Sequence, residues 1–255
     1  MLEHCLLTWS DRHGVRSEKK VDAVANFVNH SVDILVLLGV FRSCQRYLMV
    51  ELSSEVSFLW RLSAERSDGY CSVSMIVPCP PDTKVRDLTI ETDVQSLSSD
   101  STRSVSEETL EWNQEDIDLF LRLINRRQLE VNQPLAETVR VDLTDPEVVE
   151  IINVVAAAGF GVAFTSYGLI QHISGSLPVY QFDVGSLASI NTVDGFKSCI
   201  IVDVDDDDVV CVLLEDVEVR SGREHNNLCR HDLLLVKQSD ILHPDFAERR
   251  FRPAG

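Results

Sequence analysis

The chain has 255 residues, of which 44% are hydrophobic and 25% are charged, and this composition is typical of a folded protein and excludes a disordered one. Its 41 acidic residues and 23 Lys and Arg residues give a formal net charge of -18, which repels nucleic acids and anionic membranes. The charge therefore disfavours direct nucleic-acid binding and favours a partner with a basic segment.

The seven cysteines are widely spaced, and none of them belongs to a Cys-x-x-Cys pair. Most lie in apolar, strand-like runs, which is typical of buried reduced thiols in a cytoplasmic or nuclear protein. The sequence therefore predicts no metal site and no cofactor. Residues 1–10 lack the pattern of a signal peptide. The longest apolar stretch, 148–170, contains Glu150 and Asn153, so no membrane span is expected.

Residues 1–95 are predicted to form an α/β layer, because strand-like and helix-like apolar patterns alternate along them. The run from Asp33 to Leu38 is apolar at nearly every position, as in a strand that is covered on both faces. The expected elements are a strand at 6–9, a helix at 19–29, a strand at 33–38, a helix at 53–64, and strands at 70–77 and 85–92.

A serine-rich linker is expected at 96–108, since this segment has no apolar periodicity that would offset the entropy of ordering it. The middle of the chain after it is predicted to be helical. A first amphipathic helix is expected at 110–129, and its apolar face consists of Ile117, Phe120, Leu121 and Ile124.

A second helix is expected at 146–158 and has clear boundary residues. Asp145 can accept hydrogen bonds from free backbone N–H groups, Pro146 suits the first helical position and Gly159 is a typical stop. The sequence between them is almost wholly apolar. This pattern predicts a helix at the centre of a core or an interface, and the core is favoured.

Short strands are expected from residue 162 onward, and they indicate a small β-barrel or sandwich that packs with the helices as one unit over 109–244. They are predicted at 162–167, 179–182, 187–191, 198–204, 209–214 and 233–236. Four consecutive aspartates, Asp205, Asp206, Asp207 and Asp208, connect two of them as an acidic hairpin turn. Residues 245–255 are expected to form a flexible tail. The predicted fold class is therefore a mixture of α+β and α/β.

The N-terminal third resembles the opening of the endonuclease/exonuclease/phosphatase family. The matching segments are Leu6–Ser10, Asp33–Val40 and Arg66–Val73, which correspond to a first strand, a buried "DIL" strand and a Gly-containing hairpin. The positions of the family's metal-binding Glu and of its Asn hold Gly39 and Ser10. Glycine has no oxygen ligand for a divalent cation, so the resemblance implies a domain without that catalytic activity.

The segment 185–236 resembles Tudor and other SH3-like barrels, on the two strand-like runs at 193–204 and 209–217. The resemblance implies a small barrel that binds a peptide or protein. Methyl-lysine readers of this type need an aromatic cage, and the segment is poor in aromatic residues. His172 and His231 lie in apolar surroundings and are interpreted as hydrogen-bonded core residues.

These patterns favour a non-enzymatic intracellular subunit or adaptor that binds another protein through apolar and acidic surfaces. No catalytic residue is predicted. The candidate partner-binding residues are the acidic hairpin Asp205 to Asp208, then Glu215 and Asp216, and the exposed side of the helix between Glu111 and Arg127. The alternative is a divergent metal-dependent phosphoesterase or nuclease, whose carboxylates would come from positions such as Asp11, Asp33, Asp68 and Asp203.

Overall fold

The computed structural model of the chain describes residues 6–8, 49–52, 58–64, 69–78, 87–97, 107–129, 139–165, 168–173, 180–218 and 228–248. The helix predicted at 19–29 and the strand predicted at 33–38 lie outside these residues. Among the described helices, none is long and apolar enough to cross a membrane.

The described elements form a mixed α+β fold with three sheets. In chain order they are β1 (Leu6–Thr8), β2 (Met49–Leu52), β3 (Leu59–Leu62), β4 (Tyr70–Val77), β5 (Leu88–Leu97), β6 (Glu108–Glu111), α1 (Gln114–Leu129), β7 (Val139–Asp142), α2 (Pro146–Phe160), β8 (Val162–Thr165), β9 (Leu187–Thr192), β10 (Gly195–Asp205), β11 (Asp208–Leu213), β12 (Leu233–Lys237), a 3₁₀ turn (Gln238–Asp240), β13 (Ile241–Leu242) and α3 (Asp245–Glu248).

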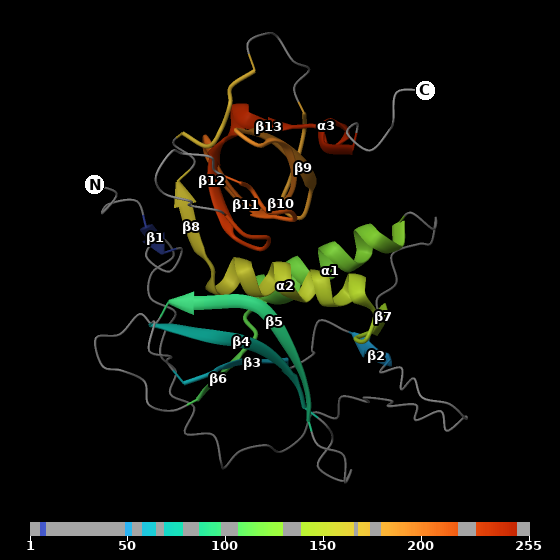
Figure 1. The fold of residues 1–255 in the computed structure, drawn as a ribbon. Coiled ribbons are helices and arrows are strands. Elements are labelled where there is room, and N and C mark those ends of the chain that lie inside the picture. The colour runs from blue at the N-terminus through green and yellow to red at the C-terminus, as the bar shows by residue number, and fades with distance from the viewer. Residues whose placement is uncertain are drawn as a thin grey trace.

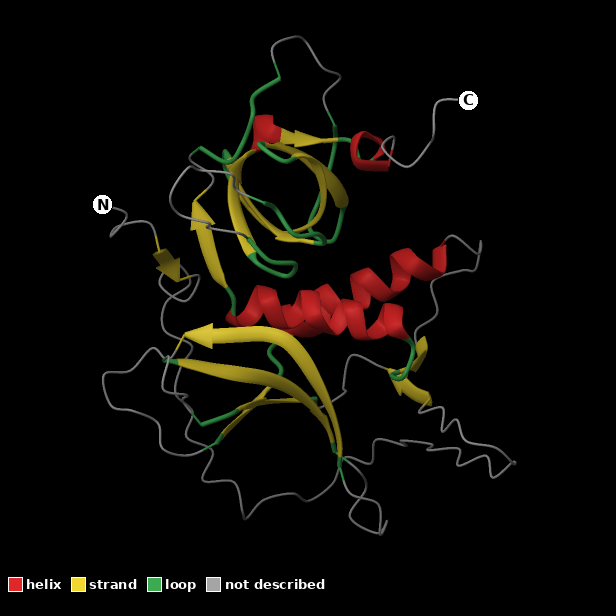
Figure 2. Cartoon of the chain, in the orientation of Figure 1, coloured by secondary structure: helices red, strands yellow, loops and turns green. Residues whose placement is uncertain are grey.

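Among the described residues, the largest sheet has seven strands in the order β1-β8-β12-β11-β10-β9-β13, and its only parallel pair is β8 with β12. Its strands β9 to β13 curve around a common centre, and β8 and β1 lie beside them (Figure 1 and Figure 2). A four-stranded antiparallel sheet has the order β5-β4-β3-β6, and β2 pairs with β7 in a separate two-stranded sheet of the described part of the chain. The mixed fold class is thus confirmed at the level of helices and sheets.

Helices α1 and α2 lie between the four-stranded and the seven-stranded sheet (Figure 1). The central core therefore combines side chains of all three layers, such as Met75 of β4, Ile152 of α2 and Val212 of β11. Helix α2 is buried along most of its length. The prediction that its almost wholly apolar sequence belongs to a core is confirmed, because the helix has a sheet on each side.

A second, inner core lies on the other face of the seven-stranded sheet. Strand β11 shows the division: Val209, Cys211 and Leu213 belong to the inner core, while Val210 and Val212 belong to the central core. Alternate residues of a strand point to opposite faces, and here both faces are covered. This explains why the sequence of β11 is apolar without alternation.

Helix α1 is fixed on the four-stranded sheet by a buried carboxylate. Asp116 Oδ2 accepts hydrogen bonds from Trp60 Nε1 (3.1 Å) and from the backbone N–H of Asn113 (3.1 Å). The backbone N–H of Asp116 donates in turn to Asn113 Oδ1 (2.8 Å), which is a reciprocal cap of the helix start. Trp60 also stacks on Trp112, with ring centroids 4.7 Å apart.

Two predicted boundaries are wrong because the residues pair with distant parts of the chain, and one predicted strand is absent from the described residues. Residues 59–62 form the central strand β3 instead of part of a helix at 53–64, since they pair with β4 on one side and β6 on the other. Leu110 belongs to β6, so α1 begins four residues later. Residues 180–182 form no strand.

Helix α2 begins as predicted but ends later than the predicted stop at Gly159. Asp145 Oδ1 accepts a hydrogen bond from the backbone N–H of Glu147 (3.0 Å), so the predicted cap is confirmed. The helix continues to Phe160, whose ring packs edge-on against Trp60 with centroids 5.6 Å apart. This aromatic contact stabilises the two residues by which the helix exceeds the predicted range 146–158.

The serine-rich segment lies between strands of one sheet. Strand β5 continues to Leu97 and β6 begins at Glu108, so the described ends of the segment are extended. Strand β6 pairs with β3, and the chain therefore returns to the same sheet after the segment. In the expected tail, residues 245–248 form the helical turn α3, in which Ala247 is buried.

Candidate functional site

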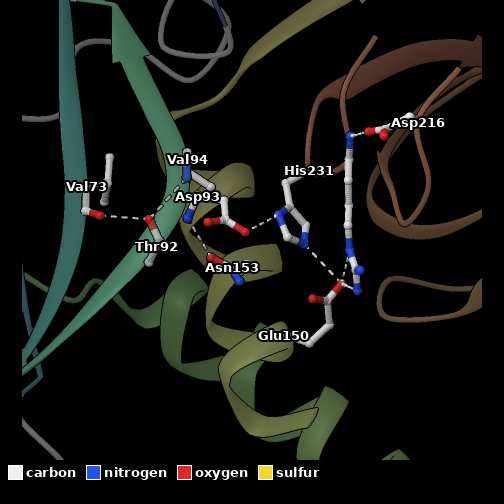
Figure 3. Close-up of polar contacts among 9 residues, drawn as sticks. Val73, Thr92, Asp93, Val94, Glu150, Asn153, Asp216 and His231 are labelled. Carbon is white, nitrogen blue, oxygen red and sulfur yellow. Dashed lines mark hydrogen bonds and ion pairs between the residues drawn. The ribbon is translucent and has the colours of Figure 1, made fainter. Parts of the chain in front are cut away.

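Strand β5 contains a bulge where it faces α2. Between the pairs Ser74↔Glu91 and Ser72↔Gln95, three residues of β5 lie opposite the single residue Val73 of β4. The hydroxyl of Thr92 donates to the carbonyl oxygen of Val73 (2.7 Å) and accepts from the backbone N–H of Val94 (3.3 Å), as Figure 3 shows. The side chain of Thr92 thus replaces ladder hydrogen bonds that the bulge interrupts.

Helix α2 completes the hydrogen bonding of this bulge. The backbone N–H of Asp93 donates to Oδ1 of the buried Asn153 (3.0 Å). Glu150 lies one turn earlier in α2, and residues three apart lie on one helix face. Glu150 and Asn153, the two polar residues after the first turn of this otherwise apolar helix, therefore point to the same place.

A third segment, Arg230–Asp232 before β12, reaches Glu150 from the seven-stranded sheet. Nε2 of His231 lies 3.0 Å from Glu150 Oε1, and the same oxygen accepts from Arg230 Nε (3.2 Å) and from its terminal nitrogen (2.7 Å). Nδ1 of His231 lies 3.8 Å from Asp93 Oδ2. Figure 3 shows His231 between Asp93 and Glu150. We call residues Thr92–Val94, Glu150, Asn153 and Arg230–Asp232 the junction.

The backbone around His231 has an unusual conformation. His231 has a φ of 70°, in the left-handed region that few non-glycine residues adopt. Three hydrogen bonds support it: His231 N–H to Leu213 O (2.8 Å), Cys229 N–H to Asp232 Oδ2 (2.8 Å) and Arg230 N–H to Asp216 Oδ1 (2.8 Å). Such strain persists only where the surrounding structure holds it in place.

Acidic groups of the junction have pKa values that are displaced in opposite directions. Burial of Glu150 opposes its ionisation, but the hydrogen bonds and positive charge of His231 and Arg230 outweigh burial and lower the pKa of this carboxyl. Burial raises the pKa of Asp232 against the hydrogen bond from the Cys229 N–H, and the charge of Asp216 adds to the increase. Burial and the same two aspartates also raise the pKa of the Cys229 thiol.

The geometry of the junction suits a structural role. The side chain of His231 is only 3% exposed, so its ring does not face solvent where a substrate would reach it. Among the residues that the structure describes, no three His, Cys, Asp or Glu side chains are placed to hold a metal ion. What the junction can do chemically is to hold three layers together through charge-assisted hydrogen bonds.

The acidic tip, which we define as Asp205–Asp208, forms the predicted hairpin turn between β10 and β11. Asp205 pairs with Asp208 in the register of the two strands, and Asp206 has a left-handed φ of 50°. The carboxylate of Asp208 binds Lys237 Nζ (2.7 Å). The carbonyl oxygen of Asp207 accepts from the backbone N–H of Gln238 (2.9 Å), so both contacts tie the tip to the end of β12.

Glu215 and Asp216 do not join the acidic tip. They follow the other end of β11, about 20 Å from the tip at the usual rise of a strand. Glu215 Oε1 accepts from the backbone N–H of Ser198 (3.2 Å), and Asp216 accepts from Arg230 as described above. The exposed side of α1 has mixed charge, since it carries Glu115 and Asp118 together with Arg122 and Arg126. The candidate partner-binding residues thus lie at separate places.

The two histidines that the sequence places in the core differ. His231 is buried and hydrogen-bonded, which confirms the interpretation. The prediction for His172 is wrong, since its side chain is 77% exposed and only its partner Asp240 is buried, at 2.7 Å from Nδ1. Of the carboxylates named for the phosphoesterase alternative, Asp203 lies in β10, and Asp11, Asp33 and Asp68 lie outside the described residues.

Sequence reasoning did not find the junction. Its one visible signal is the presence of Glu150 and Asn153 in an apolar helix, because buried polar residues need partners. Comparison with known proteins adds no assignment: no protein-family model matches the chain, and no curated protein matches it.

Proposed function

We propose that this protein is a non-enzymatic cytoplasmic or nuclear subunit or adaptor that binds a basic segment of another protein at the acidic tip. The observation that carries the proposal is the exposure of Asp205, Asp206 and Asp207 at the end of a hairpin whose position is fixed by β12. A surface that is already ordered loses little conformational entropy on binding. A basic segment would thus meet a preformed group of carboxylates.

Apolar surface lies next to this charge. Val204, which precedes the tip, is 38% exposed, and it is one of three large hydrophobic side chains that are exposed in the described part of the chain. Binding sites commonly combine charge, which steers the approach, with apolar contact, which adds affinity. We therefore expect the partner segment to pair Lys or Arg residues with at least one apolar residue.

The seven-stranded sheet is proposed to close into a small barrel of the SH3-like type. Its strong curvature and its separate inner core support this part of the proposal. The pairing order ends at β1 and β13, which pair with β8 and β9 respectively. In small barrels of this kind, hairpin connections at the rim commonly supply the binding surface.

A peptide-binding measurement tests the proposal. The probe is a fluorescent octamer of lysine, and the variant replaces Asp205, Asp206 and Asp207 by Asn. The matched control replaces Glu107, Glu108 and Glu111 by Gln, since these three residues are also exposed and carry the same charge. We expect the tip variant to bind at least about fivefold more weakly than the control, with a difference that shrinks as salt screens the charges.

Equal weakening in the two variants would show that only the net charge of -18 attracts the peptide, and would overturn the proposal. Affinity purification of the tagged full chain from cells is the second test. We expect the tip variant to recover less of the accompanying proteins than the control variant does. A rise in Tm with millimolar Mg²⁺ or Mn²⁺ would favour the phosphoesterase alternative instead.

A further inference from the structure

Both ring nitrogens of His231 face carboxylate oxygens. Nε2 lies 3.0 Å from Glu150 of α2, and Nδ1 lies 3.8 Å from Asp93 of the β5 bulge. Nδ1 is buried and has no hydrogen-bond partner among the described residues. Neutral imidazole has one N–H and one lone pair. Either neutral tautomer therefore directs a lone pair at a carboxylate, which is unfavourable.

We propose that His231 carries a proton on both nitrogens in the folded protein and acts as a pH-sensitive latch between the layers. The imidazolium donates a charge-assisted hydrogen bond to Glu150 and is attracted by Asp93, so it joins the segment before β12 to both α2 and β5. Loss of one ring proton replaces the attraction between an N–H group and a carboxylate by a repulsion between a nitrogen lone pair and that carboxylate. The seven-stranded sheet is then held less firmly on the helices and on the four-stranded sheet.

The charges around the ring are mostly negative. Besides Glu150 and Asp93, the segment before β12 contributes Asp232, and Asp216 holds the backbone of Arg230. The guanidinium of Arg230 shares Glu150 with the imidazolium and repels it, but this side chain is 52% exposed, so solvent weakens the repulsion. The same screening weakens the attraction of Asp93, whose side chain is 80% exposed. The thiol of Cys229 adds no charge, because its pKa is raised.

Thermal unfolding across pH tests the latch with Asp93→Asn, which removes one charge from an exposed side chain. An imidazolium gives stability that is largest in acid and is lost as pH rises through the range in which imidazole deprotonates. We expect the variant to melt roughly 2 to 4 °C below the wild type near pH 5, and the gap to close near pH 8. Glu111→Gln is the matched control, on the opposite edge strand of the same sheet, and should show no such trend.

A gap that stays constant from pH 5 to pH 8 would overturn the proposal, as would a gap that Glu111→Gln reproduces. His231→Gln keeps one donor toward Glu150 without the charge, and should remove most of the effect of Asp93→Asn in a double-mutant cycle. If that variant does not fold, the ¹⁵N shifts of the His231 ring in the wild type decide. Two protonated nitrogens in neutral buffer support the latch, and one protonated nitrogen excludes it.

Discussion

Carboxylates of the junction and of the acidic tip have the same chemistry and opposite surroundings. Glu150 is mostly buried and is in contact with Arg230 and His231, whereas Asp205, Asp206 and Asp207 are exposed. An ionised carboxylate that loses its water must be compensated by nearby donors, and one that keeps its water need not be. The net charge of -18 therefore includes two groups of carboxylates, one that supports the fold and one that is exposed at a hairpin turn.

The largest expected effect is that of Glu150→Ala in the junction. The change leaves Nε2 of the buried His231 without its acceptor and Arg230 without its partner. Removal of one member of a buried charged pair costs about 3 to 5 kcal/mol, and partial exposure reduces this to about 2 to 3 kcal/mol here. Urea unfolding measures the loss. Glu115→Ala on the exposed side of α1 is the control, and an equal loss there would contradict a special role for Glu150.

Asn153→Ala should have the next largest effect, because it leaves the backbone N–H of Asp93 without an acceptor inside the protein. An unsatisfied buried donor costs about 1 to 3 kcal/mol, and because this hydrogen bond is only part-buried we expect a loss near the lower end, about 1 kcal/mol. Hydrogen exchange gives the sharper measurement: the Asp93 amide should exchange faster, while amides of β11 change less. Asn191→Ala removes an exposed hydrogen bond to Gln171 as the control. An unchanged Asp93 amide would show that Asn153 does not hold the bulge.

Local signals explain which parts of this fold could be predicted from the sequence. The cap at Asp145, the apolar face around Phe120 and Ile124, and the strand 70–77 depend on neighbouring residues, and all three are confirmed. The hairpin at the acidic tip depends on two apolar runs that flank four aspartates. Its position is predictable because the contacts that define it are only a few residues apart.

The junction depends on contacts that no local pattern contains. Asp93 and Asn153 are 60 positions apart, and Glu150 and His231 are 81 positions apart. The same holds for β3, whose helical spacing is overridden by two neighbouring strands, and for the four-residue strands β2 and β7, which pair with each other across about 90 residues. The sequence suggests one acidic binding surface of six residues, Asp205 to Asp208 with Glu215 and Asp216. In the structure they lie at the two ends of β11 and therefore form two separate groups.

Asp232→Asn should show that not every acidic residue of the junction stabilises the fold. Burial raises the pKa of Asp232, so ionisation of this carboxyl is less favourable in the folded than in the unfolded protein, and stability is lost as pH rises through the raised pKa. Asn keeps the oxygen that accepts from Cys229 without the charge. We expect a gain of less than about 1 kcal/mol at neutral pH that disappears below about pH 4. A loss of stability of the Asp232→Asn variant at neutral pH would contradict the prediction that the charge of Asp232 destabilises the fold.

The smallest effect on stability is expected when Asp205, Asp206 and Asp207 are changed to Asn together. Exposed substitutions usually change the free energy of unfolding by less than about 0.5 kcal/mol, and Asn tolerates the left-handed φ of Asp206. Asp208 is kept, because it binds Lys237. Urea unfolding of this variant should therefore match the wild type, although it binds the basic peptide more weakly. A decrease of more than about 1 kcal/mol in the free energy of unfolding would show that the fold requires the carboxylates of the tip, as it requires those of the junction.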